Sequence, residues 1–367
     1  MNPPRSLYVH IPFCRHICPY CDFPKLLLST GYQERYTKAL LNEDTRYQGL
    51  HFDTIYLGGG TPSALDASLL KLILEELVRR HGTPKEFTIE CNPEDVNPRL
   101  VSLLKACGIN RISLGVQSIK ESTLKMLGRR HTPEDAARAI ALCREAGIDN
   151  LSCDFIYGLP GERMDDLKND LDWVRKENLP HVSFYALQLE PHTMFAIQKV
   201  QPPSDDTLSL YYDTIDTALR SMGLDRYEVS NWARPGFESR HNTCYWRGDP
   251  YAAIGYGASS YVDGVRAVRT RSMTDYLAGK YIFSSRAESL AEQEFDYLMC
   301  NLRLRDGFSL KDFKERFNKD FLLAYADRIE ALRDDLEIDD SRVRVKRDKL
   351  YILDSILVDL LDFSSLR

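Results

Sequence analysis

Short apolar runs alternate with helix-like segments through the first half of the chain, and this alternation constrains the fold more than any other feature. The runs that read as strands are residues 7–11, 54–57, 87–90, 111–115, 150–157 and 181–189. The segments that read as helices are residues 32–47, 68–80, 98–107, 132–147, 165–177 and 204–222. Strands separated by helices at this spacing predict an α/β fold with a parallel sheet, either open or closed into a barrel.

Three cysteines follow the first of these strands, in the sequence Cys14-Arg15-His16-Ile17-Cys18-Pro19-Tyr20-Cys21. Iron–sulfur clusters select thiolate ligands, and three thiolates leave one iron of a four-iron cluster without a protein ligand. A reactive metal site needs such an open position. The alternative is a structural zinc site with His10 or His16 as the fourth ligand, although zinc signatures usually contain paired C-x2-C units.

Composition and charge limit the function classes. The chain has 367 residues, enough for one large domain and a smaller one, and its net charge of −6 argues against a nucleic-acid binder. No apolar run reaches the length of a membrane span, and residues 1–5 are not a signal peptide. Six of the nine cysteines are scattered without pairing spacing, which indicates free thiols in a reducing compartment. We therefore expect a cytoplasmic protein that is not an integral membrane protein.

Flexible or acidic residues stand at the ends of several predicted strands. The second strand runs into Gly58-Gly59-Gly60-Thr61-Pro62, and glycines allow a backbone to approach a ligand closely. The phosphate-loop pattern G-x4-G-K-S/T is absent from this stretch. Glu90 ends the third strand, where it either points into a site or caps the next turn. Asp154 lies inside an apolar run, and because a buried carboxylate is costly without a partner, we expect it to bind something.

The composition changes after residue 225. Residues 227–261 are rich in aromatic and small side chains, and we expect them to cover the mouth of the barrel. Helix-like stretches at 287–301, 309–317 and 323–335 are then followed by two apolar runs, 343–345 and 350–353, which read as a hairpin. Helices followed by a hairpin are typical of a winged helix, but the acidic run at 334–340 disfavours DNA binding, so we interpret this part as a structural cap. The predicted divisions are 1–225, 226–285 and 286–367.

Together these motifs resemble the radical S-adenosylmethionine (SAM) superfamily, and within it the HemW proteins, relatives of the oxygen-independent coproporphyrinogen III oxidase. The superfamily signature is C-x3-C-x2-C after the first strand, with an aromatic residue, here Tyr20, before the third cysteine. The stretches that carry the closer resemblance are residues 11–23, 58–63, 110–118, 154–160 and 227–246. The resemblance implies a partial six-stranded (β/α)6 barrel with a smaller C-terminal helical, winged-helix-like domain.

The resemblance also implies two cofactors at the cysteine loop. A [4Fe-4S] cluster on Cys14, Cys18 and Cys21 would bind SAM at its open iron. In this family the glycine motif contacts the amino and methionine end of SAM, the glutamate pairs with its amino group, and the aspartate binds the ribose. The implied SAM-binding residues are Tyr8, Tyr20, Gly59, Gly60, Thr61, Glu90, Gln117, Arg129 and Asp154. A solvated helix end is the alternative for the arginine, and core packing is the alternative for the two tyrosines.

HemW proteins have an H-N-x-x-Y motif associated with haem, and it stands here at residues 241–245. His241 and Tyr245 are the implied haem-binding residues, since histidine is a standard axial haem ligand and tyrosine can be one. Cys244 between them could also attach haem. The implied function is a haem chaperone that delivers haem to an acceptor, for which a respiratory, membrane-associated protein is one candidate. One departure is Gly257-Ala258-Ser259, where family members often read Gly-Ala-His, so a second histidine contact is lost.

The alternative function is enzymatic: an oxygen-independent coproporphyrinogen III oxidase of porphyrin biosynthesis. There the reduced cluster cleaves SAM, and the resulting radical abstracts hydrogen from a porphyrinogen side chain before decarboxylation. Arg129, Arg130, Arg240 and Arg247 could bind the porphyrinogen carboxylates. The oxidase carries a sizeable segment before its cysteine motif, whereas thirteen residues precede Cys14 here, so we expect the chaperone.

Overall fold

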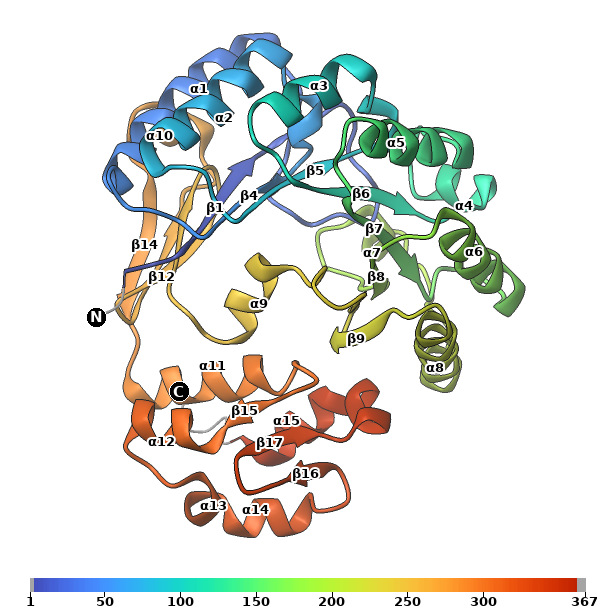
Figure 1. The fold of residues 1–367 in the computed structure, drawn as a ribbon, viewed down its shortest axis with the longest axis vertical. Coiled ribbons are helices and arrows are strands. Elements are labelled where there is room, and N and C mark those ends of the chain that lie inside the picture. The colour runs from blue at the N-terminus through green and yellow to red at the C-terminus, as the bar shows by residue number, and fades with distance from the viewer. Residues whose placement is uncertain (1–2, 362–367) are drawn as a thin grey trace.

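Six parallel strands form the centre of one curved sheet. The structure, a computed structural model, describes residues 3–361 of the chain. The central strands, in spatial order, are β1 (Ser6–Ile11), β4 (Thr54–Gly59), β5 (Glu86–Cys91), β6 (Arg111–Gln117), β7 (Asn150–Tyr157) and β8 (His181–Ala186). Sequence order equals spatial order, and every neighbouring pair is parallel. The predicted partial six-stranded barrel is therefore confirmed (Figure 1).

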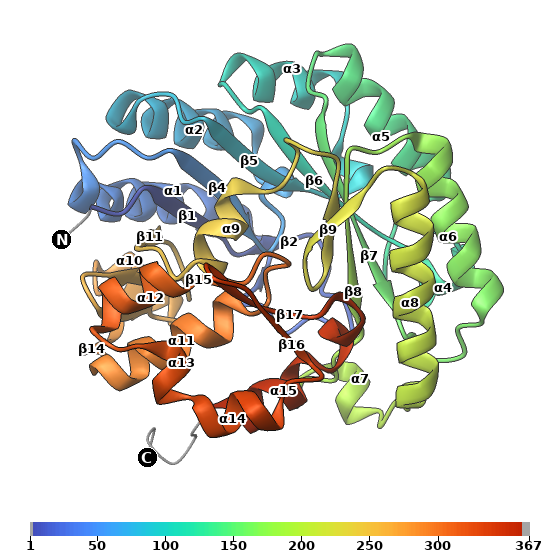
Figure 2. The same cartoon turned by 60° about the horizontal axis from the view of Figure 1, so that its bottom comes forward.

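Helices cover the convex outer face of this sheet, as Figures 1 and 2 show from two directions. They are α1 (Thr30–Asp44), α2 (Ala67–His81), α3 (Pro98–Ala106), α4 (Glu121–Met126), α5 (Pro133–Glu145), α6 (Met164–Glu177) and α8 (Asp205–Ser221). Local signals set their starts: Asp66 and Asn97 cap α2 and α3, and Thr132 with Asp135 forms a capping box on α5. The apolar faces of the helices and strands merge into one buried core.

Residues 226–285 do not form one cover over the barrel mouth: residues 229–231 line the cavity there, whereas the helix with the haem motif lies at the other end. The segment lengthens the sheet at both edges, through β9 (Asp225–Glu228) and β10 (Asn231–Ala233) on one side and β11 (Tyr251–Ile254), β12 (Ser259–Val262), β13 (Val265–Arg269) and β14 (Ile282–Ala287) on the other. Between them, α9 (Arg240–Trp246) contacts Thr54 and Glu86, the first residues of β4 and β5. Helix α9 thus closes the N-terminal end of the strands, opposite the mouth.

Short elements complete this part of the chain. Two-residue strands β2 (Phe13–Cys14) and β3 (Leu26–Leu27) pair in parallel and bracket the cysteine loop. The others are α7 (Met194–Ile197), α10 (Met273–Leu277) and the 3-10 turns Thr45–Tyr47, Pro62–Ala64 and Pro93–Asp95. In the described range no helix is both long enough and apolar enough to cross a bilayer.

The C-terminal part has its own core of phenylalanines, with Phe308, Phe313 and Phe321 almost fully buried and the Phe321 ring edge-to-face with the other two. Its elements are α11 (Leu290–Asn301), β15 (Phe308–Ser309), α12 (Leu310–Phe317), α13 (Phe321–Ala324), α14 (Ala326–Ala331), β16 (Leu336–Ile338), β17 (Arg342–Val345), the 3-10 turn Arg347–Ile352 and α15 (Leu353–Leu360). The strands form a small antiparallel sheet in the order β15-β17-β16. This combination of helices and a hairpin agrees with the predicted winged-helix-like domain. The predicted domain boundaries at residues 225 and 285 remain predictions.

The hairpin itself is misplaced in the prediction. The partner of β17 is β16, within the acidic run, and residues 350–353 lie in a 3-10 turn and the start of α15. The acidic run can turn because the carboxylate of Asp339 accepts hydrogen bonds from the backbone N–H groups of Ser341 and Arg342. The later leucines are spaced so that Leu353, Ile356, Leu357 and Leu360 share one buried helix face.

Candidate cluster and cofactor site

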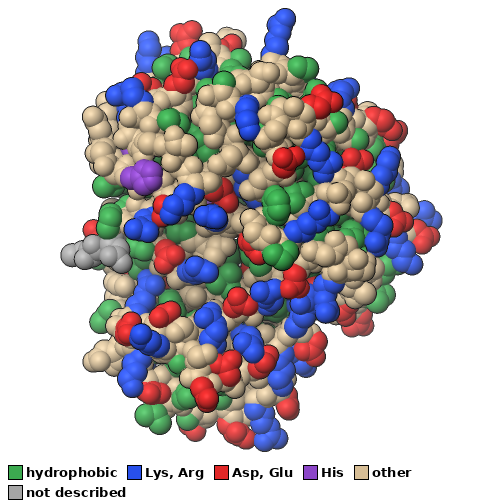
Figure 3. All heavy atoms as spheres, in the orientation of Figure 1, with side chains coloured by type: hydrophobic (Ala, Val, Ile, Leu, Met, Phe, Trp, Pro, Cys, Tyr) green, Lys and Arg blue, Asp and Glu red, His purple; other side chains and the backbone are tan. Residues whose placement is uncertain are grey.

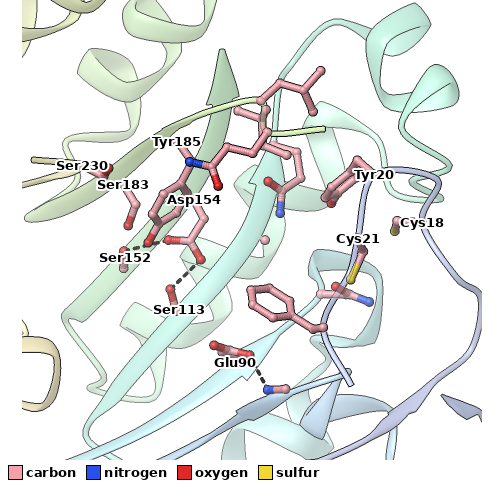
Figure 4. Close-up of a pocket in the computed structure, with 18 of the residues that line it drawn as sticks. Cys18, Tyr20, Cys21, Glu90, Ser113, Ser152, Asp154, Ser183, Tyr185 and Ser230 are labelled. Atoms are coloured by element: carbon pink, nitrogen blue, oxygen red, sulfur yellow. Dashed lines mark hydrogen bonds between the residues drawn. The ribbon is translucent and has the colours of Figure 1, made fainter. Parts of the chain in front are cut away.

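A cavity of about 600 Å³ lies at the mouth of the barrel, beside the C-terminal ends of the parallel strands. It continues inside the barrel to Ser239 and Asn242 near the start of α9. This volume is typical of a small-molecule or cofactor site. Most of the predicted site residues line it, namely Cys14, Cys18, Tyr20, Cys21, Gly59, Gly60, Thr61, Glu90, Gln117, Arg129 and Asp154. The remaining three, Tyr8, His241 and Tyr245, do not. Figure 4 labels five of the lining residues: Cys18, Tyr20, Cys21, Glu90 and Asp154.

The three cysteines of the loop face this cavity. Cys14 is buried at the end of β2, and Cys18 and Cys21 are partly exposed in a turn closed by a backbone hydrogen bond of 3.2 Å from Cys21 N to Cys18 O. The Thr61 hydroxyl donates to Cys14 Sγ at 3.6 Å, and an Arg129 N–H donates to Cys18 Sγ at 3.9 Å. The Thr61 hydrogen bond lowers the pKa of the Cys14 thiol, but burial outweighs it and raises that pKa to about 11. Thiolates are the form that binds metal.

The arrangement of the thiols suits a cluster better than a single zinc ion. Within residues 3–361, no three His, Cys, Asp or Glu side chains converge closely enough to hold one metal ion. A zinc site requires that convergence, whereas the thiolates around a four-iron cluster bind separate irons. His10, one proposed zinc ligand, already shares hydrogen bonds with the Tyr8 hydroxyl at 3.0 Å and the Pro24 carbonyl at 2.7 Å.

Several buried polar atoms beside the cavity have no hydrogen-bond partner among the described residues, which indicates that a ligand binds there. His16, the other proposed zinc ligand, lines the cavity, and neither of its buried ring nitrogens has a partner among the described residues. The same holds for Nε of Arg129. Buried polar groups are normally hydrogen-bonded, so orphaned atoms around one cavity fit a bound polar cofactor.

The glycine motif is required by close packing against the cysteine loop. A Cβ on Gly60 would lie 2.6 Å from the Pro12 carbonyl and 3.0 Å from Cys14 Sγ. Gly59 has a φ of +117°, and a Cβ there would lie 2.4 Å from the His10 ring. Only glycine tolerates both the backbone conformation and the contact. The motif therefore fixes the strand end against the thiols and leaves its backbone facing the cavity.

Two partly buried carboxylates, Glu90 and Asp154, face the cavity from neighbouring parts of the sheet (Figure 4). Glu90 accepts hydrogen bonds from the Tyr56 hydroxyl at 2.7 Å and from Gly59 N at 3.0 Å. Asp154 accepts from the Ser113 hydroxyl at 2.9 Å. Burial raises the pKa of Glu90 to about 7, helped by the charge of Asp154, and burial also raises the pKa of Asp154. Neither forms an ion pair with a Lys or Arg of residues 3–361, so both remain available to a cationic or hydroxyl-bearing ligand.

Gln117 and Arg129 line the same cavity as the cysteines and the two carboxylates. Gln117 has a φ of +68°, unusual for a residue other than glycine, at a register shift where β6 pairs with β7. Such strain and bulges re-aim side chains and are concentrated at functional sites. Arg129 turns inward and donates to Asn92 Oδ1 at 2.8 Å and Gly115 O at 2.6 Å. The alternative of a solvated helix end is therefore wrong for Arg129.

The haem motif lies at the other end of the barrel from the cysteines. His241 is 1% exposed, and its ring stacks on Tyr56 with centroids 5.1 Å apart. Nδ1 of His241 is 2.8 Å from the Thr54 hydroxyl, and Nε2 is 2.7 Å from the Tyr245 hydroxyl. Burial lowers the pKa of His241 to about 3, so the imidazole is neutral. Tyr8 packs beside Tyr56 at 6.1 Å, within this aromatic layer and outside the cavity.

Several cavity residues were missed by the sequence analysis. Ser113, Ser152, Ser183 and Tyr185 line the cavity beside Asp154 (Figure 4). Their positions along the strands could have identified them, because residues an even number apart in a strand point to the same face. The pairs that share a face in this way are Ser113 and Gln117, Ser152 and Asp154, and Ser183 and Tyr185.

Comparisons with known proteins agree with this geometry. Residues 8–174 match the family model of the radical SAM superfamily, and residues 289–348 match that of the HemN C-terminal domain. The chain is 36% identical over 341 residues to the heme chaperone HemW of Lactococcus lactis subsp. lactis, with 90% of each chain covered. It is 37% identical over 324 residues to the heme chaperone HemW of Escherichia coli, with 85% of each covered.

The chain belongs to the HemW family. Its fold is also that of the coproporphyrinogen III oxidase HemN of Escherichia coli, with a TM-score of 0.86 over 99% of this chain and 91% of that one. The sequence identity of that pair is 20%, so the likeness shows the fold alone. Membership of the radical SAM superfamily implies a [4Fe-4S] cluster and SAM as cofactors of this HemW family member.

We expect Glu90→Gln to weaken SAM binding by about tenfold or more, because the variant loses the charge that would pair with the amino group of SAM. Equilibrium dialysis with labelled SAM on the anaerobically reconstituted protein measures this. Glu162→Gln is the matched control: Glu162 also accepts two hydrogen bonds, both from backbone N–H groups, and also has a pKa raised to about 7 by burial, but it does not line the cavity. Equal SAM affinity in the two variants would remove Glu90 from the SAM site.

SAM affinity should also rise with pH through about 7 in the wild-type protein. Because burial raises the pKa of Glu90 to about 7, the group is a neutral acid below that pH and a carboxylate above it. Only the carboxylate can pair with a cation. The pH profile of SAM binding should lose this step in Glu90→Gln, and a step that persists in the variant would assign it to another group.

Proposed function

We propose that this protein is a haem chaperone, which binds haem and transfers it to an acceptor protein. The observation that carries the proposal is family membership: the chain aligns over nine-tenths of its length with a relative named heme chaperone HemW. The motif associated with haem is intact at His241 and Tyr245. A respiratory, membrane-associated protein remains our candidate acceptor.

The cofactor cavity has a separate role in this proposal. Cys14, Cys18 and Cys21 would hold the cluster, and the predicted residues around Glu90 and Asp154 would hold SAM. The cluster and SAM together supply the chemistry of radical formation when bound. What the chain's own residues contribute is orientation: thiols on one side, two carboxylates across the cavity, and the Gln117 and Arg129 side chains between them.

Haem ligation by His241 requires a local change. Both ring nitrogens are hydrogen-bonded, to Thr54 and Tyr245, so one of these bonds has to break before the imidazole can bind iron. Ser259 stands where family members often have a second histidine. It is two residues from Gly257, which packs against Pro24 of the cysteine loop, at the opposite end of the barrel from His241.

The geometry gives less support to a coproporphyrinogen oxidase. The four arginines proposed for porphyrinogen carboxylates are not gathered around one cavity. Arg129 lines the cofactor cavity, whereas Arg240 and Arg247 face away from it, at the other end of the barrel.

The test is a pair of assays on the anaerobically reconstituted protein. In the first, the haem-loaded protein is mixed with an apo-haem protein, and transfer is followed by the absorption spectrum of the acceptor. In the second, the protein is incubated with SAM, a reductant and coproporphyrinogen III. The proposal predicts transfer without decarboxylation. Decarboxylation with many turnovers would establish the oxidase instead.

A further inference from the structure

One side chain, Tyr56 of β4, contacts both the predicted SAM site and the haem motif. It lines the cofactor cavity, and its hydroxyl donates to Glu90 Oε1 at 2.7 Å. The face of its ring stacks on the His241 imidazole, with centroids 5.1 Å apart and an interplanar angle of 27°. The cysteines and the haem motif lie at opposite ends of the barrel, and Tyr56 spans part of the distance between them.

The register of the sheet produces this arrangement. Thr54 and Tyr56 are two residues apart on β4 and therefore point to the same face. Both hold His241, since the Thr54 hydroxyl lies 2.8 Å from its Nδ1 and the Tyr56 ring covers its face. On the neighbouring strand β5, Thr88 pairs with Tyr56, and Glu90 follows two residues closer to the barrel mouth. A carboxylate of the cavity and an imidazole of the haem motif thus contact one aromatic side chain.

Helix α9 presents charged residues outward and its histidine inward. Figure 3 shows Lys and Arg side chains gathered where the barrel meets the C-terminal domain, with some carboxylates among them. Arg240 and Arg247, at the two ends of α9, are exposed, whereas His241 is 1% exposed. The next residue, Asn242, lines the cofactor cavity. The imidazole is therefore enclosed, and it can turn only if its neighbours inside the barrel give way.

The hydrogen bond to Glu90 decides how easily Tyr56 gives way. Ligation of iron by His241 requires the imidazole to turn, because both of its nitrogens are already hydrogen-bonded. The stacked Tyr56 ring has to shift as the imidazole turns, and the bond to Glu90 holds that ring in place. The ammonium group of SAM would keep Glu90 as a charged carboxylate, and hydrogen bonds to charged groups are about twice as strong as those between neutral groups. Bound SAM would therefore hold Tyr56 more firmly.

We propose that Tyr56 is a positioning residue that couples the two sites, so that bound SAM weakens the binding of haem iron by His241. The inference rests on the proposed function and adds how the cofactor cavity regulates the haem motif. Coupling between two sites is reciprocal, so haem bound at His241 weakens SAM binding by the same factor. The element with two arrangements is the His241 ring, either bonded to Thr54 and Tyr245 or turned toward iron.

The test measures haem affinity at the Soret band for the anaerobically reconstituted protein without reductant, so that SAM is not consumed. Haemin is titrated alone, with saturating SAM, and with saturating methylthioadenosine, which lacks the amino acid part of SAM. The variant is Tyr56→Phe, which keeps the ring and removes the hydroxyl. The control is Tyr212→Phe, because Tyr212 also lines the cavity but its hydroxyl donates to Val229 O at 2.7 Å.

We expect SAM to weaken haemin binding by about fivefold or more in the wild type and in Tyr212→Phe, and by less than about twofold in Tyr56→Phe. Methylthioadenosine should leave haemin binding unchanged in all three proteins. Without SAM, Tyr56→Phe should bind haemin at least as tightly as the wild type, a result that damage to the site would not produce. Equilibrium dialysis of labelled SAM, with and without haemin, should give the same coupling factor for each protein.

The outcomes separate this inference from the proposed function. No haemin binding by the wild type contradicts both. Saturable haemin binding that SAM leaves unchanged contradicts the coupling and leaves the chaperone standing. Coupling of equal size in Tyr56→Phe and the wild type would exclude Tyr56 as its carrier, and equal weakening by methylthioadenosine would exclude the contact with Glu90. Loss of haemin binding in Tyr56→Phe alone would also count against the coupling, because it would make the hydroxyl part of the haem site.

Discussion

Replacement of Cys14 by alanine is expected to abolish the iron–sulfur cluster. The thiol ends β2, is 7% exposed and faces the cavity together with Cys18 and Cys21. With three thiolates as the protein ligands, the loss of one leaves two irons without a protein ligand. Iron and acid-labile sulfide should fall from about four per chain in the reconstituted wild type to near zero. Colorimetric iron and sulfide analysis with the visible absorption spectrum measures this.

Cys107→Ala is the matched control, because Cys107 is 8% exposed and lies outside the cavity. It should retain full iron and sulfide. A wild-type protein that binds about one zinc and no sulfide would instead support the structural zinc alternative. Equal cluster loss in both variants would show that the effect comes from folding and not from ligation.

Replacement of Arg269 by methionine is expected to lower the free energy of unfolding by about 3–5 kcal/mol. Arg269 is 2% exposed, and its Nε donates to Glu43 Oε1 at 2.9 Å. The other carboxylate oxygen of Glu43 accepts from Gly255 N at 2.9 Å and from the Tyr276 hydroxyl at 2.7 Å. The variant leaves a buried carboxylate without its cation in the contact between α1 and the edge of the sheet. Urea denaturation followed by circular dichroism measures the change.

Two further variants separate burial from simple charge loss. Glu43→Gln/Arg269→Met removes both charges and should recover part of the stability, since the uncompensated charge is gone. Lys71→Met breaks an exposed pair with Glu75 and should change stability by less than about 1 kcal/mol. A loss in Arg269→Met no larger than in Lys71→Met would contradict the structural role of the buried pair.

The sequence predicted the central sheet well because its strands are buried on both faces. Each of the six runs is rich in apolar residues, and polar residues recur mainly at alternate positions in several of them, so strand positions followed from local composition and pattern. The gathering of the cysteines, the glycine motif and the two carboxylates also followed, because the C-terminal ends of parallel strands meet at one edge. The strained backbone of Gln117 was not predictable, since it arises from the register of two strands.

The position of α9 depends on contacts between distant parts of the chain. Thr54 and His241 are 187 residues apart, and Glu86 accepts from the backbone of Arg240 and His241 across more than 150 residues. Nothing near residue 241 indicates which end of the barrel it closes. The same reason explains the misplaced hairpin, where an acidic stretch pairs as a strand with residues 342–345. Local sequence patterns predicted most of the helices and strands, whereas packing between distant residues determined which of these elements contact one another.

The most direct test of the haem-chaperone account is a haem titration of the anaerobically reconstituted protein, followed at the Soret band, for the wild type, His241→Ala and His181→Ala. His181 is the matched control, since it is also 1% exposed and both its ring nitrogens are hydrogen-bonded. The account predicts saturable binding of one haem per chain that weakens in His241→Ala and persists in His181→Ala. No saturable binding by the wild type, or equal binding by all three proteins, would contradict it.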